Sequence, residues 1–196
     1  MPSAMITLSS GSLELELSPS IGGAISNFSW IADRQCTPIL RSSNTPLENV
    51  LDAANFPLVP FANRIRGGCF TFRGRRVALS PNMAGDPSPL HGQGWTSPWS
   101  VESQSEAEAV LAFEHEPGEW PWAYEAKQRF MLAGDSLQLH LICRNTSRDP
   151  MPCGLGYHPY FHCSPRTRIQ ADVENVWTVD EHVLPVARMP AVGRYA

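Results

Sequence analysis

Short runs in which apolar and polar residues alternate recur along this chain, and they indicate β-strands. Residues 13–17 alternate strictly, which places three leucines on one face of an extended strand and two glutamates on the other. Residues 109–113 and 128–132 have the length and apolar content of further strands. After a Gly134-Asp135 turn, the alternation resumes over residues 137–144. The pattern predicts antiparallel strands that each bury one face.

Turn signals complete this prediction. Arg73-Gly74 separates two short apolar runs, residues 70–72 and 77–79, and predicts a β-hairpin. The 196 residues include 18 prolines and 14 glycines, and no helical periodicity extends beyond about two turns. We therefore expect a single all-β domain over residues 1–196, folded as an antiparallel β-sandwich. The last segment, residues 183–196, contains two prolines and is expected to end without a closing strand.

Composition and charge argue against nucleic-acid-binding, membrane-spanning and secreted proteins. Charged residues make up 17% of the chain and the formal net charge is −4. Basic residues concentrate only at Arg73-Gly74-Arg75-Arg76, which predicts a solvated turn and argues against nucleic acid as a partner. No apolar stretch approaches the length of a membrane span, and the N-terminus has no signal-peptide pattern. Five cysteines without a C-x-x-C pair predict reduced thiols and a cytoplasmic location.

One histidine stands in a setting that suits proton transfer. Pro159 disfavours helical backbone at His158, so the imidazole should project from an extended segment in a fixed direction. Imidazole titrates near neutral pH and can donate or accept a proton there. Tyr160, two residues later, should point to the same side. Taken alone, a histidine between aromatic residues is more often a packing residue.

Three blocks together resemble the aldose 1-epimerase (galactose mutarotase) family, over a stretch from about Leu13 to Leu184. The blocks are Phe56-Pro57-Leu58-Val59-Pro60-Phe61-Ala62-Asn63-Arg64-Ile65, Pro89-Leu90-His91-Gly92 and Gly156-Tyr157-His158-Pro159-Tyr160-Phe161. The resemblance implies a β-sandwich of the mutarotase (supersandwich) type. It also implies interconversion of the α- and β-anomers of free aldoses, such as galactose or glucose, by acid/base ring opening. The implied partner is a small aldohexose, with no metal or redox cofactor.

The resemblance also implies roles for particular residues. His158 matches the family's general acid at the ring oxygen, and His91 matches a second imidazole that aids binding and polarisation. Asn63 and Arg64 match the pair that binds sugar hydroxyls, and Tyr160 is a plausible lining residue. Two structural alternatives stay open: Arg64 as an ion-pair partner and His91 as the cap of a turn.

The family's general base and a substrate-binding aspartate lie in a C-terminal third that has no counterpart here. The chain is therefore expected to be truncated, with C-terminal strands missing. Neither Glu174 nor Glu181 lies in a matching motif. The alternatives are a non-catalytic carbohydrate-binding or regulatory module, a hexose-6-phosphate epimerase-like protein, and a fragment that does not fold.

Two further groups of residues have alternative interpretations. His158, His162, Cys163 and Cys153 could be imagined as a zinc site, but they lack the paired spacing of zinc ligands, so no metal is expected. Four tryptophans could form a sugar-stacking platform or could be packing residues. They are Trp95, Trp99, Trp120 and Trp122.

Overall fold

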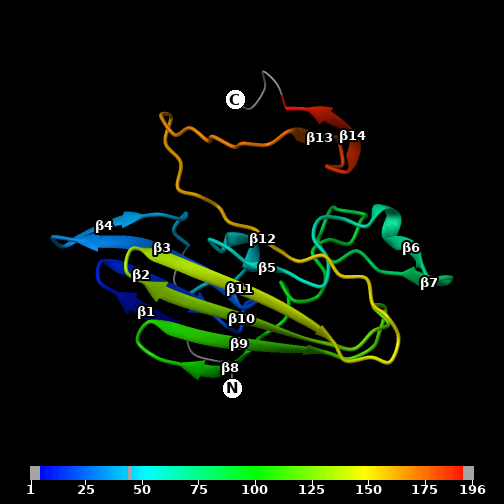
Figure 1. The fold of residues 1–196 in the computed structure, drawn as a ribbon, viewed down its shortest axis with the longest axis horizontal. Helices are drawn as coiled ribbons and strands as arrows, with labels where there is room; N and C mark the ends of the chain where they lie inside the picture. The colour runs from blue at the N-terminus through cyan, green and yellow to red at the C-terminus, as the bar shows by residue number, and fades with distance from the viewer. Residues whose placement is uncertain (1–4, 44–45, 192–196) are drawn as a thin grey trace.

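The alternation at residues 13–17 forms a half-buried strand in the computed structural model, which describes residues 5–43 and 46–191. The three leucines of this strand are at most 3% exposed, and the glutamates between them are only partly covered. The strand lies in an antiparallel sheet with the order β1-β2-β3-β4 (Figure 1). Its members are β1 (Ile6–Ser10), β2 (Leu13–Ser18), β3 (Ala24–Ala32) and β4 (Gln35–Pro38).

A second antiparallel sheet has the order β11-β10-β9-β8. It contains the three strands predicted at residues 109–113, 128–132 and 137–144, each somewhat longer than its apolar pattern, and Gly134-Asp135 makes the turn between the last two. The members are β8 (Ser100–Gln104), β9 (Glu108–His115), β10 (Tyr124–Ala133) and β11 (Ser136–Asn145).

The two sheets bury a common apolar core between them. Leu15 and Leu17 of β2 belong to the same buried cluster as Leu111 of β9 and Phe130 of β10. Gln128 is fully buried in this interface, and its Nε2 donates a hydrogen bond to the carbonyl of Gly23 across it, at 3.0 Å. The prediction of an antiparallel β-sandwich is therefore confirmed.

The predicted hairpin around Arg73-Gly74 is also present. It consists of β6 (Cys69–Phe72) and β7 (Arg75–Ala78). Both turn residues have positive φ, 48° at Arg73 and 82° at Gly74, as tight hairpin turns require. The arginines of this hairpin are exposed to solvent, as expected for a solvated turn.

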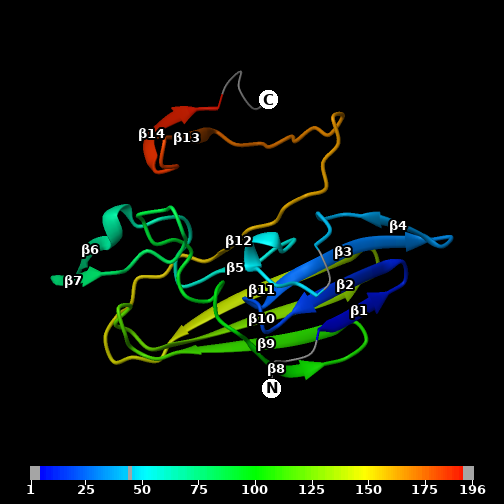
Figure 2. The same cartoon turned by 180° about the vertical axis from the view of Figure 1, so that it is seen from behind.

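Part of the last segment, residues 185–190, forms a strand, but this strand does not close the sandwich, and residues 192–196 lie outside the described part of the chain. β13 (Asn175–Val179) and β14 (Pro185–Pro190) form an antiparallel hairpin. The two prolines of β14 lie at its two ends, where a missing N–H costs least, and this is why they did not break the strand. The hairpin stands apart from both large sheets in either view (Figures 1 and 2). An ion pair of 3.3 Å between Arg66 and Asp180 connects it to the rest of the chain.

Helical structure is limited to two single turns among the described residues, η1 (Val50–Asp52) and η2 (Arg66–Gly68). No helix in this part of the chain is long and apolar enough to cross a membrane.

Candidate active site

Short backbone pairings bring together three segments that lie far apart in the sequence. β12 (Gly156–Tyr157) pairs with β5 (Pro57–Leu58). Just beyond this pairing, the N–H of His158 donates to the carbonyl of Phe56 at 3.0 Å. On the other side, the N–H of His91 donates to the carbonyl of Asn63 at 3.0 Å. The three blocks of the sequence resemblance are therefore neighbours in space.

A cavity of about 500 Å³ opens where these segments meet, a volume suited to a small molecule. Apolar side chains, including Phe56, Leu58 and Trp95, form much of its wall. All five residues predicted for the site line this cavity: Asn63, Arg64, His91, His158 and Tyr160.

His158 is held between two aromatic rings. Its ring stacks on Phe56 with centroids 4.9 Å apart and on Tyr160 with centroids 4.7 Å apart. The second contact shows that His158 and Tyr160 share one side of the segment, as their spacing predicted. Burial lowers the pKa of His158, and the positive charge of Arg41 lowers it further, while a hydrogen bond with its own backbone opposes them. The neutral imidazole is therefore the predominant form at pH 7, and the two stacked rings fix its direction.

His91 is the more deeply buried of the two imidazoles, with 7% of the residue exposed. Its ring centroid lies 5.5 Å from that of His158, with the planes at 73°. Burial lowers its pKa to about 4, assisted by the charges of His158 and Arg64. Its buried Nδ1 has no hydrogen-bond partner in the described chain. The backbone of His91 bends here with a positive φ of 62°, and its ring lines the cavity.

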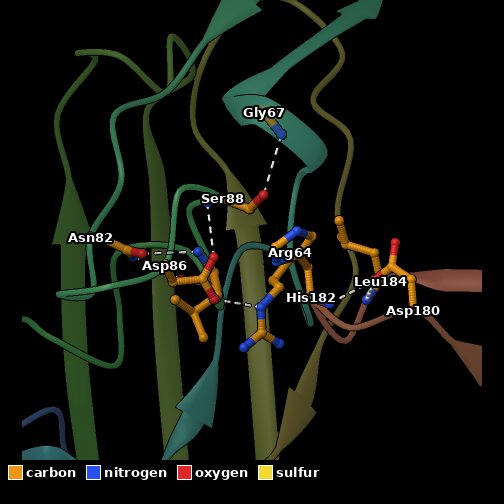
Figure 3. Close-up of polar contacts among 9 residues, drawn as sticks. Arg64, Gly67, Asn82, Asp86, Ser88, Asp180, His182 and Leu184 are labelled. Atoms are coloured by element: carbon orange, nitrogen blue, oxygen red, sulfur yellow. Dashed lines mark hydrogen bonds and ion pairs between the residues drawn. The ribbon is translucent and has the colours of Figure 1, made fainter.

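Asn63 and Arg64 line the cavity from the first block. Asn63 has a φ of 61°, a left-handed conformation that asparagine tolerates better than most residues. Nε of Arg64 lies 2.6 Å from Oδ2 of Asp86, so the ion-pair interpretation of Arg64 is confirmed. The two terminal nitrogens of its guanidinium carry no dashed line in Figure 3 and have no partner among the described residues. Arg64 therefore combines an ion pair with free donors at the cavity.

Two side chains that the sequence did not indicate support the site. The guanidinium carbon of Arg41 lies 3.6 Å from the ring centroid of Tyr160, and Nε of Arg41 donates to the carbonyl of Ala53. Asp86 lies in a Gly-Asp-Pro turn, and such turns are common in loops. No signal in the sequence links Asp86 to Arg64, which lies 22 positions away.

The four tryptophans are packing residues, each 2% exposed. Trp99, Trp120 and Trp122 belong to the main core. Trp95 contributes to the wall of the cavity, and its Nε1 donates to the carbonyl of Leu90 at 3.1 Å. No open stacking surface is formed by these side chains.

The residues considered as zinc ligands do not form a metal-binding group, and the late glutamates do not line the cavity. Across residues 5–43 and 46–191, no group of three or more potential metal ligands is present. Neither Glu174 nor Glu181 lines the cavity, and none of its described lining residues is a carboxylate.

Comparison with known proteins agrees with this arrangement. The protein-family model for aldose 1-epimerase matches residues 5–194. The uncharacterized protein YphB of Escherichia coli K12 is 42% identical over 178 residues, which are 91% of this chain and 59% of YphB. An aldose 1-epimerase of the same organism is 28% identical over 120 residues, which are 59% of this chain and 33% of the enzyme.

A solved structure supports the same conclusion. The crystal structure of a protein from E. coli K12 superposes with a TM-score of 0.87 at 38% sequence identity, covering 97% of this chain and 63% of that one. The chain thus spans less than two thirds of the length of YphB and of the crystallised protein. With the family model matched over nearly all its residues, and the three motif blocks gathered at one cavity, the chain belongs to the aldose 1-epimerase family.

Proposed function

We propose that this chain binds a free aldohexose, such as galactose or glucose, and promotes the interconversion of its anomers. The observation that carries the proposal is the convergence of Asn63, Arg64, His91, His158 and Tyr160 on one cavity of about 500 Å³. The cavity combines apolar walls with a few polar groups from different segments, which is typical of small-molecule sites.

The proposed reaction needs proton transfer at two oxygen atoms of the sugar. The proton of the anomeric hydroxyl passes to water, because the described lining of the cavity holds no carboxylate to accept it. The bond between C1 and the ring oxygen breaks, and the ring oxygen receives a proton. Rotation about the C1–C2 bond and reclosure then give the other anomer, with no net gain or loss of protons. His158 is assigned to the ring oxygen: the fraction of the imidazole that is protonated near neutral pH donates its proton there as the ring opens, becomes neutral, and recovers the proton on closure, in a direction fixed by the rings of Phe56 and Tyr160.

The remaining polar residues are assigned to binding. Arg64 offers its free terminal N–H groups to hydroxyl oxygens, and Asn63 beside it supplies an amide. His91 stays neutral near pH 7 and presents an imidazole next to His158, which suits polarisation of the sugar without a second positive charge. Tyr160 keeps His158 in place and lines the cavity.

A non-catalytic carbohydrate-binding module is the second candidate, and a specific observation favours it. The described lining of the cavity contains no carboxylate that could remove the anomeric proton. A hexose-6-phosphate is less well supported, since Arg73 and Arg75 line a different cavity, beside Trp122. Sugar binding is common to both candidates, whereas accelerated anomerisation belongs only to the first.

The test is the anomerisation of freshly dissolved α-galactose, followed by polarimetry against a protein-free blank. We expect acceleration that is lost in His158→Gln and kept in His162→Gln, because His162 is exposed and does not line the cavity. A parallel titration with galactose, followed by amide NMR, reports binding. Saturable binding without acceleration would favour the binding module. A folded protein that neither binds galactose nor accelerates the reaction would refute both.

A further inference from the structure

The guanidinium of Arg64 is anchored on one side by the carboxylate of Asp86. The Nε–Oδ2 distance is 2.6 Å, and the two side chains are only 15% and 10% exposed. An arginine has five N–H donors, and this ion pair uses the one on Nε. The four N–H groups on the terminal nitrogens carry no dashed line in Figure 3 and have no partner within the described chain. Arg64 also lines the cavity that holds His91 and His158.

A backbone hydrogen bond fixes the side chain of Asp86 independently of its contact with Arg64. Its Oδ1 accepts a hydrogen bond from the backbone N–H of Ser88 at 2.9 Å, which leaves Oδ2 for the guanidinium. The Ser88 N–H lowers the pKa of the Asp86 carboxyl, and Arg64 lowers it further, against the opposing effect of burial. The carboxylate is therefore ionised at neutral pH, and its bond to Arg64 is charge-assisted.

The loop that carries Asp86 is braced at both sides. Oγ of Ser88 accepts a hydrogen bond from the N–H of Gly67 at 3.3 Å. The side chain of Asn82 donates to the carbonyl of Leu90 at 2.7 Å and accepts from its N–H at 2.9 Å (Figure 3). The next residue after this brace is His91. One loop therefore holds both the imidazole of His91 and the carboxylate that orients Arg64.

Without an anchor, a long arginine side chain samples many rotamers, and binding must restrict them. We propose that Asp86 is a positioning residue for sugar binding: its carboxylate holds the Arg64 guanidinium so that the terminal nitrogens face the cavity at a fixed place relative to His91. This inference rests on the proposed function, because it assumes that the free donors of Arg64 bind sugar hydroxyls.

The first measurement is the NMR signal of the Arg64 Nε–H group in the full chain. We expect slow exchange with solvent in the wild type, and an altered shift with faster exchange in Asp86→Asn. Glu108→Gln is the matched control, because Glu108 pairs with Nε of Arg129 at 2.8 Å on the β9–β10 surface. That control should change the Arg129 signal and leave the Arg64 signal as it is.

The second measurement is the affinity for galactose. Asp86→Asn should bind about tenfold more weakly than the wild type, whereas Glu108→Gln should bind like the wild type. Added galactose should shift the terminal N–H signals of Arg64 and leave its Nε–H signal nearly unchanged. This last measurement uses the wild-type chain alone, so it decides the matter even if the Asp86 variant does not fold.

Two results would overturn the positioning role. One is an unchanged galactose affinity in folded Asp86→Asn, and the other is an Arg64 Nε–H group that exchanges as fast in the wild type as in a free arginine. If the wild type binds no galactose while the Arg64 signal is protected, the proposed function fails and the anchoring by Asp86 is upheld. The two failures are therefore distinguishable.

Discussion

Burial of His91 makes the stability of this protein sensitive to mild acid. In the folded chain the pKa of His91 is lowered to about 4, against an ordinary value of 6.5, chiefly because the ring is removed from water. Between these two values the unfolded chain binds a proton that the folded chain excludes. The free energy of unfolding must therefore fall as the pH drops from about 6.5 towards 4, and this contribution is fully present only above that range.

The magnitude follows from the two pKa values. Their difference of about 2.5 corresponds to a loss of about 3 kcal/mol once the pH is below 4. At pH 5, where the folded form is still mostly unprotonated, the loss is about 2 kcal/mol relative to pH 7.5. For a chain of this size, that loss should lower Tm by about 4–8 °C.

The assay compares the wild type with His91→Gln, which keeps a polar side chain but cannot titrate. Urea unfolding, followed by tryptophan fluorescence, is measured for both proteins at pH 7.5 and at pH 5. We expect the wild type to lose about 2 kcal/mol more than the variant between these pH values. The lowered pKa of His158 gives a loss of the same sign in both proteins, so it cancels in the comparison to a first approximation.

The reasoning would be refuted if both proteins lost the same stability between pH 7.5 and pH 5. Such a result would mean that His91 gains a proton in the folded chain as readily as in the unfolded chain. The imidazole would then be charged in mild acid, and its assigned role as a neutral group beside His158 would fail as well.

Further predictions concern the backbone beside the site and one thiol. Gly92→Ala should destabilise the chain by more than 1 kcal/mol in urea unfolding, because the new Cβ would lie 2.2 Å from the carbonyl oxygen of Val59. The control is Gly11→Ala, which is also at positive φ but has nothing within 4 Å of the new Cβ, and it should destabilise the chain less. Equal destabilisation by the two substitutions would contradict this steric argument. The neighbouring Cys143 thiol lowers the pKa of Cys153 to about 7, while the pKa of Cys143 itself is raised. At pH 7, iodoacetamide should therefore modify Cys153 about tenfold faster than an ordinary cysteine, as measured by peptide mass spectrometry, and a rate no higher than that of the other exposed cysteines would argue against this thiol pair.

Much of the fold was predictable because apolar and polar residues alternate with a period of two along a strand that buries one face. The leucines of β2 and the alternating side chains of β11 indicated their inner faces directly, and both faces are as predicted. The sequence pattern does not predict β14, because prolines seldom lie inside a strand; here they lie at its two ends, where the pairing tolerates them.

Part of the site was also predictable from neighbouring positions in the sequence. His158 and Tyr160 are two positions apart on an extended segment, so their shared side follows from strand geometry, and their stacked rings agree with it. The family resemblance added Asn63, Arg64 and His91, and the fold brings all of them to the same cavity.

The sequence by itself determined the strand pattern, the hairpin turn and the identity of the polar residues that meet at the cavity. Only the tertiary structure decided how these residues are held and charged. The carboxylate that orients Arg64 lies 22 positions away, and the guanidinium above Tyr160 belongs to Arg41. The lowered pKa of His91 depends on burial by distant segments. Such contacts carry no local periodicity, because they arise only when segments remote in the chain fold against one another.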